Sequence, residues 1–75
     1  MKATFIIYLN EEHRDTLDNS ELWFRNVDIN IIPNIGWRYE YIDGDKSYYG
    51  KITKIEVFKN PSKNEETLYI TIEEY

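Results

Sequence analysis

The chain has 75 residues, among them 14 acidic and 9 basic side chains, and a net charge of −5. This length fits one domain over residues 1–75, near the lower size limit for folding alone, and the absence of cysteine excludes disulfides. The acidic balance disfavours nonspecific binding to nucleic acid or to anionic membranes. A compact core must therefore supply the stability, and an aromatic content of 16% provides large side chains for it.

Residues 4–10, TFIIYLN, predict a first strand that is apolar on both faces and therefore covered on both sides.

No apolar run reaches the roughly 20 residues needed to span a bilayer. The N-terminal segment also lacks the small-residue cleavage pattern of a signal peptide. We therefore expect a cytoplasmic protein that does not enter the membrane.

Residues 11–21 are polar, and Leu17 is their single apolar anchor. Asn10 could cap a helical turn, because Glu11 and Glu12 would then lie favourably near its N-terminus. One leucine cannot bury a helical stripe, however. The segment favours an exposed turn or long loop over a stable helix.

Residues 22–31, LWFRNVDINI, alternate as a strand that ends before Pro33, which cannot donate a ladder hydrogen bond. The alternation places Phe24 on one face and Trp23 and Val27 on the other. Gly36 then provides a residue that can take positive φ in a turn.

Residues 37–42 alternate again, and the Asp43-Gly44 pair that follows predicts a hairpin turn. In the next strand, Ile52 and Ile55 are three residues apart. A β-bulge between these two isoleucines would bring both inward, and small barrels need such a bend to close.

The last strand, residues 67–75, follows a polar loop and keeps strict period two. Symmetric pairing with the preceding strand places Val57 opposite Leu68 and Ile55 opposite Ile70 on the core side. A one-residue slip would turn this apolar set outward, so the register is well specified.

Five strand candidates joined by short turns predict an all-β fold, either a single five-stranded small barrel or a strongly bent antiparallel sheet. The run IIPNIGWRYEYIDGDKSYYGKITKIEVF, followed by LYITIEE, resembles SH3-like β-barrel proteins of bacteria and phages, many without assigned function. The resemblance covers roughly residues 28–74 and is carried by Pro33, Gly36, Gly44 and the strand spacing. It implies a fold and brings no functional residues with it.

Catalytic and metal-binding motifs are missing from the sequence. The three serines, Ser20, Ser47 and Ser62, have no supporting motif, and a single histidine, His13, cannot form a structural zinc site. Adjacent carboxylates are expected to be solvated charges, because a domain this small hardly forms a cleft. We expect no enzymatic activity, no cofactor and no metal site.

Twelve aromatic rings exceed what the interior of such a barrel should hold, so several must lie at its surface. Tyr, Trp and Arg are enriched at interface centres. We therefore predict a protein-binding or accessory module whose candidate partner-binding residues are Trp23, Trp37, Arg38 and Tyr69. An edge strand could also recruit a partner strand, including that of a second copy.

Two alternatives remain open. Exposed rings beside basic side chains could stack the bases of a single-stranded nucleic acid, although acidic residues interleave with the basic ones. The acidic side chains could instead mimic nucleic acid and occupy a nucleic-acid-binding protein.

Overall fold

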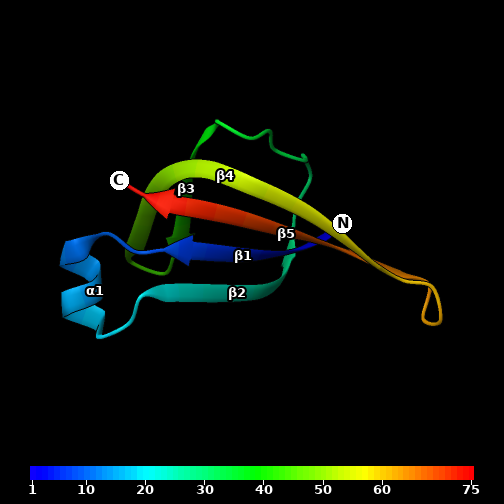
Figure 1. Cartoon of the computed structure of the whole chain (residues 1–75), viewed down its shortest axis with the longest axis horizontal. Helices are drawn as coiled ribbons and strands as arrows, with labels where there is room; N and C mark the ends of the chain where they lie inside the picture. Colours follow the sequence, from blue (N-terminus) through cyan, green and yellow to red (C-terminus); the bar gives the residue numbers. More distant parts are fainter.

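The computed structural model describes residues 1–75 and contains one five-stranded sheet and one short helix. The elements are β1 (Lys2–Tyr8), α1 (Glu11–Leu17), β2 (Glu21–Asp28), β3 (Arg38–Asp43), β4 (Lys46–Asn60) and β5 (Glu65–Glu74). The strand order is β2-β1-β5-β4-β3, and the sheet curls into a half-barrel in which β3 passes behind the other strands (Figure 1). This confirms the prediction of a small all-β, barrel-like fold. No helix has the length and apolar character needed to cross a membrane.

One strand pair departs from the expected antiparallel arrangement. β1 and β5 run parallel, with Ala3 beside Leu68 and Ile7 beside Ile72, whereas the other three strand pairs are antiparallel. Parallel neighbours cannot be joined by a tight turn. Here the rest of the chain forms the connection, so the five-stranded sheet is mixed and not antiparallel throughout.

The β4–β5 pairing confirms the register expected from the sequence. Val57 lies opposite Leu68 and Ile55 opposite Ile70, and the register shifts between Ile52 and Lys54. This irregularity lies where the apolar spacing changes from three residues to two. It allows Ile52, which is fully buried, to face the core together with Ile70.

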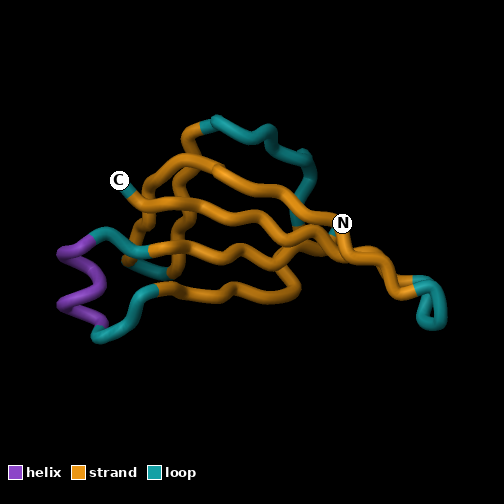
Figure 2. Tube along the Cα trace, viewed as in Figure 1, coloured by secondary structure: helices purple, strands orange, loops and turns teal.

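Beyond the Val57–Leu68 pair, β4 and β5 leave the sheet as a two-stranded arm (Figure 2). β1 accompanies β5 only as far as Leu68, and β3 accompanies β4 only at its opposite end. Val57 stands at the base of the arm and is 51% exposed, because no neighbouring strand covers it on the β4 side. Its predicted place in the core is therefore wrong, although its register is right.

β2 contains a bulge that the sequence alternation did not predict. Two residues, Arg25 and Asn26, stand opposite Thr4 alone, and Asn26 has φ 56°. The extra residue shifts the alternation, so Val27 packs against the core instead of sharing the outer face with Trp23.

Residues 11–17 form helix α1, where a loop was expected. The Asn10 side chain accepts a hydrogen bond from the His13 N–H at 2.8 Å, and Asp18 ends the helix in the left-handed region at φ 50°. Leu17 packs against the core, and the Glu74 carboxylate on β5 binds both the Asn10 N–H and the His13 ring. These tertiary contacts supply what a single apolar residue could not.

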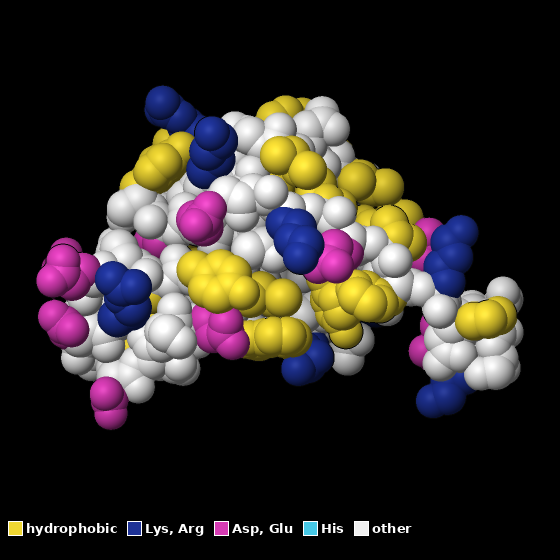
Figure 3. Space-filling model, viewed as in Figure 1, with side chains coloured by type: hydrophobic (Ala, Val, Ile, Leu, Met, Phe, Trp, Pro, Cys, Tyr) yellow, Lys and Arg dark blue, Asp and Glu magenta, His cyan; other side chains and the backbone are white.

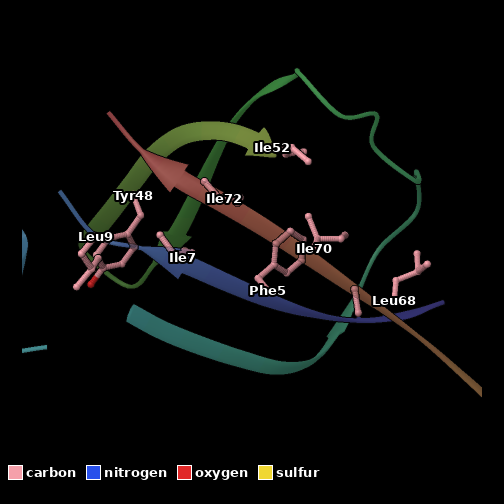
Figure 4. Packing of buried hydrophobic residues seen from close by; sticks show 9 residues of the cluster. Phe5, Ile7, Leu9, Tyr48, Ile52, Leu68, Ile70 and Ile72 are labelled. Carbon is pink, nitrogen blue, oxygen red and sulfur yellow. The ribbon is translucent and has the colours of Figure 1, made fainter. Parts of the chain in front are cut away.

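The core lies inside the curl (Figure 4). Its buried residues are Ala3, Phe5, Ile7, Leu9, Tyr48, Ile52, Leu68, Ile70 and Ile72. Tyr41 on β3 stacks on Phe24 on β2 at a centroid distance of 4.3 Å, and Tyr39 stacks on Phe5 at 5.3 Å. Aromatic side chains from the two end strands therefore cover the inner face.

The predicted turn glycines adopt the expected backbone conformation. Gly36 has φ 93° and Gly44 has φ 65°. Asp43 pairs with Lys46, so Gly44 is the first of two loop residues, as in a type II′ hairpin.

Candidate functional site

Three aromatic rings form a continuous patch on the outer face of the sheet. Trp23 on β2 lies 6.4 Å from Tyr69 on β5, and Tyr69 lies 4.7 Å from Phe58 on β4, measured between ring centroids. We call these three residues the aromatic patch. Figure 3 shows hydrophobic side chains gathered across the middle of this face, with charged side chains scattered around them.

Strand alternation explains why these rings point outward. Trp23 lies between two residues that pack on the core, and Tyr69 lies between the buried Leu68 and Ile70. Phe58 follows Val57 on the far side of the β4 bulge and is 50% exposed, while Trp23 is 44% exposed. Tyr69, between them, is partly buried. Since rings of this kind bury large apolar areas, two half-exposed rings joined by a third form a favourable contact surface.

Smaller side chains on β1 and β5 form the floor of the patch. Ile6 pairs with Trp23 on one side and with Thr71 on the other, and Thr4 pairs with Tyr69. Ile6, Thr4 and Thr71 are all buried although they belong to the outer face. The rings therefore pack over β1, which fits the expectation that the first strand is covered on both sides.

Charged groups of both signs border the rings. The Trp23 Nε1–H donates to Glu21 Oε1 at 3.0 Å, and the Arg25 guanidinium carbon lies 4.7 Å from the centroid of the Trp23 ring. Across the patch, Lys54 Nζ lies 3.3 Å from Glu56 Oε1. The border is thus balanced in charge, and the contacts to Trp23 orient its indole ring.

The structure brings together two of the four predicted partner-binding residues. Trp23 and Tyr69 share the aromatic patch. Trp37 comes immediately before β3 and helps line a separate hollow, and Arg38, the first residue of β3, lies beside Tyr49. The curl of the sheet carries β3 away from the outer face of β2, so the four residues do not form one surface (Figure 1).

Phe58 was not among the predicted residues, although the sequence contained its signal. The β4–β5 register that places Glu56 opposite Tyr69 also places Phe58 opposite Thr67, on the same face as Tyr69. Diagonal neighbours in a sheet lie within reach of large side chains. The two rings are therefore adjacent as a direct consequence of the register.

Arg38 belongs to a second aromatic group. The rings of Tyr49 and Tyr75 lie 5.3 Å apart, and Tyr49 is 44% exposed. Their phenol groups, that of Tyr49 first, raise the pKa of Arg38 above its ordinary value. The guanidinium therefore keeps its charge beside these rings.

A hollow of about 320 Å³ lies where the connection between β2 and β3 passes the end of the sheet. It is lined by Asp28, Ile29, Asn30, Ile31, Pro33, Trp37 and Tyr39. The Lys2 ammonium group lies 2.8 Å from the Asp28 carboxylate and lowers the pKa of Asp28 through this hydrogen bond and its charge. Most of the lining residues belong to the loop between β2 and β3, and several of them are apolar. The one charged residue at the rim, Asp28, is paired with Lys2.

The groups most capable of chemistry are engaged in structural contacts. The Glu74 side chain is only 3% exposed, and its Oε2 atom lies 2.6 Å from His13 Nδ1. This contact joins β5 to α1. The Ser47 hydroxyl donates to Glu40 Oε2 at 2.5 Å. No group of three or more His, Asp or Glu side chains is placed to hold a metal ion.

Comparisons with protein-family models, curated proteins and solved structures found no match to this chain. The resemblance to SH3-like barrels stays a prediction.

Proposed function

We propose that this protein is a non-enzymatic binding module that recognises another protein through the aromatic patch of Trp23, Tyr69 and Phe58. The observation that carries the proposal is the contiguity of three rings contributed by β2, β5 and β4, of which Trp23 and Phe58 are about half-exposed and Tyr69, between them, is partly buried. Each ring is held by a paired strand, so the surface is largely formed before binding and loses little conformational entropy.

The charges around the patch favour a protein over a nucleic acid. Arg25 lies over the Trp23 ring and Lys54 is paired with Glu56, so neither cation stands in a basic groove. Strong nucleic-acid binding requires several cations facing phosphates, with release of counterions. A protein interface instead has aromatic anchors at its centre and a polar rim of both signs.

The test compares binding partners captured by the wild type and by a Tyr69→Ala, Phe58→Ala variant from a lysate of the source organism. Tyr49→Ala is the matched control, because Tyr49 is as exposed as Trp23 but belongs to the other aromatic group. We expect a captured protein to be lost with the double variant and kept with the control. Both variants should first show an unchanged fold by circular dichroism.

Capture that is equal for all three proteins would reject the aromatic patch as the binding surface. An oligonucleotide titration at low and high salt provides the second arm. Tight binding that weakens steeply with salt would overturn the choice of a protein partner in favour of single-stranded nucleic acid.

A further inference from the structure

β2 has an unpaired edge at one end of the sheet. β1 occupies its other side, and Figure 1 shows no further segment along the outer edge of β2. Unpaired N–H and C=O groups on such an edge can pair with another strand. The residues that present these groups follow from the hydrogen-bonding pattern of the β1–β2 pair.

The outward-facing backbone groups belong to Glu21, Trp23 and Arg25. The Leu9 N–H donates to the Ser20 carbonyl at 3.0 Å, at the end of the β1–β2 register. Hydrogen-bonded and non-hydrogen-bonded residues alternate along an antiparallel pair. Ser20 and every second residue after it therefore face β1, and the residues between them face away. The bulge formed by Arg25 and Asn26 ends this regular edge, which leaves a short segment from Glu21 to Arg25, the first bulge residue.

We propose that two copies of this chain associate by antiparallel pairing of their β2 edges, with Trp23 opposite Trp23 of the second copy. This register places Glu21 opposite Arg25 of the second copy, and the two-fold symmetry repeats the pair. Leu22 then stands opposite Phe24 on the inner face. Each outward N–H and C=O between Glu21 and Arg25 gains a partner, and two opposite charges meet on each side of the tryptophans.

Charge excludes the neighbouring symmetric registers. A pairing centred on Glu21 would place two carboxylates opposite each other, and one centred on Arg25 would oppose two guanidinium groups. Like charges directly opposite in a sheet are destabilising. A pairing centred on Leu22 or Phe24 would oppose a charge to an indole ring and would leave the second charge without its partner. The Glu21-x-Trp23-x-Arg25 segment is thus complementary to itself in one register.

Pairing in this register would join the two outer faces into one surface. Trp23 belongs to the aromatic patch of each copy, so the two patches would meet at the two-fold axis. The edge offers only five residues, and association should therefore be weak and observed at protein concentrations up to about 1 mM. The inference goes beyond the proposed function, because it names a second copy as a partner and uses the edge of β2 in place of its face.

Sedimentation equilibrium of wild type, Glu21→Arg and Arg25→Glu at low salt tests the proposal. We expect the wild type to dimerise and each variant to do so at least about tenfold more weakly, because each homodimer then opposes two pairs of like charges. An equimolar mixture of the two variants should form a heterodimer, since all four charges are complementary again. The double variant Glu21→Arg, Arg25→Glu should recover wild-type association.

Two controls match the change in net charge away from the edge. Asp15→Arg on α1 and Lys46→Glu in the β3–β4 hairpin are both at exposed positions. The Glu21→Arg variant lowers the net acidic charge, which by itself would favour association, so weakening of its dimer opposes that trend. The proposal would be overturned if the wild type stayed monomeric up to about 1 mM. It would also be overturned if neither Glu21→Arg nor Arg25→Glu changed the dissociation constant of the dimer. The Tyr69→Ala, Phe58→Ala variant should still dimerise, which separates this result from the test of the proposed function.

Discussion

The rings of Phe24 and Tyr41 stack at a centroid distance of 4.3 Å, although their strands stand at opposite ends of the sheet. The half-barrel is therefore closed at this point by side chains in place of a backbone ladder. We expect Phe24→Leu and Tyr41→Leu to be coupled by about 0.5–1.5 kcal/mol, as aromatic pairs are. Urea unfolding of the two single variants and the double variant measures this coupling. Strictly additive effects would show that the rings are neighbours without mutual stabilisation.

Ile70 and Val57 belong to the same hairpin face and differ in burial, since Ile70 is 0% and Val57 is 51% exposed. Ile70→Ala should lower the free energy of unfolding by about 2–5 kcal/mol, because it opens a cavity in the core. Val57→Ala should cost about 1 kcal/mol or less, because much of that side chain stays in water. Chemical denaturation measures both losses. Equal losses would contradict the finding that Val57, at the base of the arm, is largely exposed to solvent.

Gly44 takes a positive φ of 65° with open space around the position of a Cβ atom. Gly44→Val should therefore destabilise the fold by about 1–2 kcal/mol or more through backbone strain alone. Ser62→Val in the opposite hairpin loop should leave the melting temperature unchanged. Chemical synthesis allows a sharper control, because D-alanine at position 44 favours positive φ and should restore stability. A D-alanine variant as unstable as the L-valine variant would remove strain as the cause.

Gly50 is constrained for a different reason. A Cβ atom at this position would collide with the carbonyl oxygen of Glu73 and approach Ile72 Cγ2 to 2.8 Å. Gly50 is paired with both Tyr39 and Glu74, so the backbone has little freedom to move away. We expect Gly50→Ala to cost about 1–3 kcal/mol by overpacking. Lys51→Ala, at the exposed neighbouring position, should be nearly neutral in the same thermal unfolding experiment.

Burial raises the pKa of Tyr41 above its ordinary value of 10.0, and the charges of Asp43 and Tyr39 add to the shift. A phenol with a raised pKa in the folded state keeps its proton longer there than in the unfolded chain. Its contribution to stability is complete below pH 10.0 and is lost as the pH rises through the folded-state pKa. Tyr41→Phe should therefore flatten the decline in stability above that pH, measured by urea unfolding at several alkaline pH values. An unchanged slope would mean that Tyr41 titrates alike in both states.

The second half of the fold follows from its sequence because the relevant signals are local. The change in apolar spacing at Ile52 and Ile55 predicts the bulge, and the alternation of Leu68 and Ile70 then specifies the hairpin register. The same alternation places Tyr69 on the outer face. These inferences need only neighbouring residues and one turn.

The features that sequence reasoning missed depend on contacts between distant parts of the chain. Helix α1 is held by Glu74, whose carboxylate accepts a hydrogen bond from the Asn10 N–H although the two residues are 64 positions apart in the sequence. The joining of Trp23 to Phe58 through Tyr69 requires the strand order, and the separation of Trp37 requires the curl of the sheet. No local pattern contains the strand order or the curl.

The parallel pairing of β1 with β5 has a consequence for how the molecule is made. The first strand of the sheet acquires its second neighbour only when the last strand is available, and this pair occupies the middle of the sheet. Contacts between such distant segments close long loops and slow folding. On the ribosome, β1 and β2 can form at most an isolated hairpin, which is marginally stable in water. The nascent chain should therefore remain sensitive to proteases until β5 has left the exit tunnel, and then fold in a single late step.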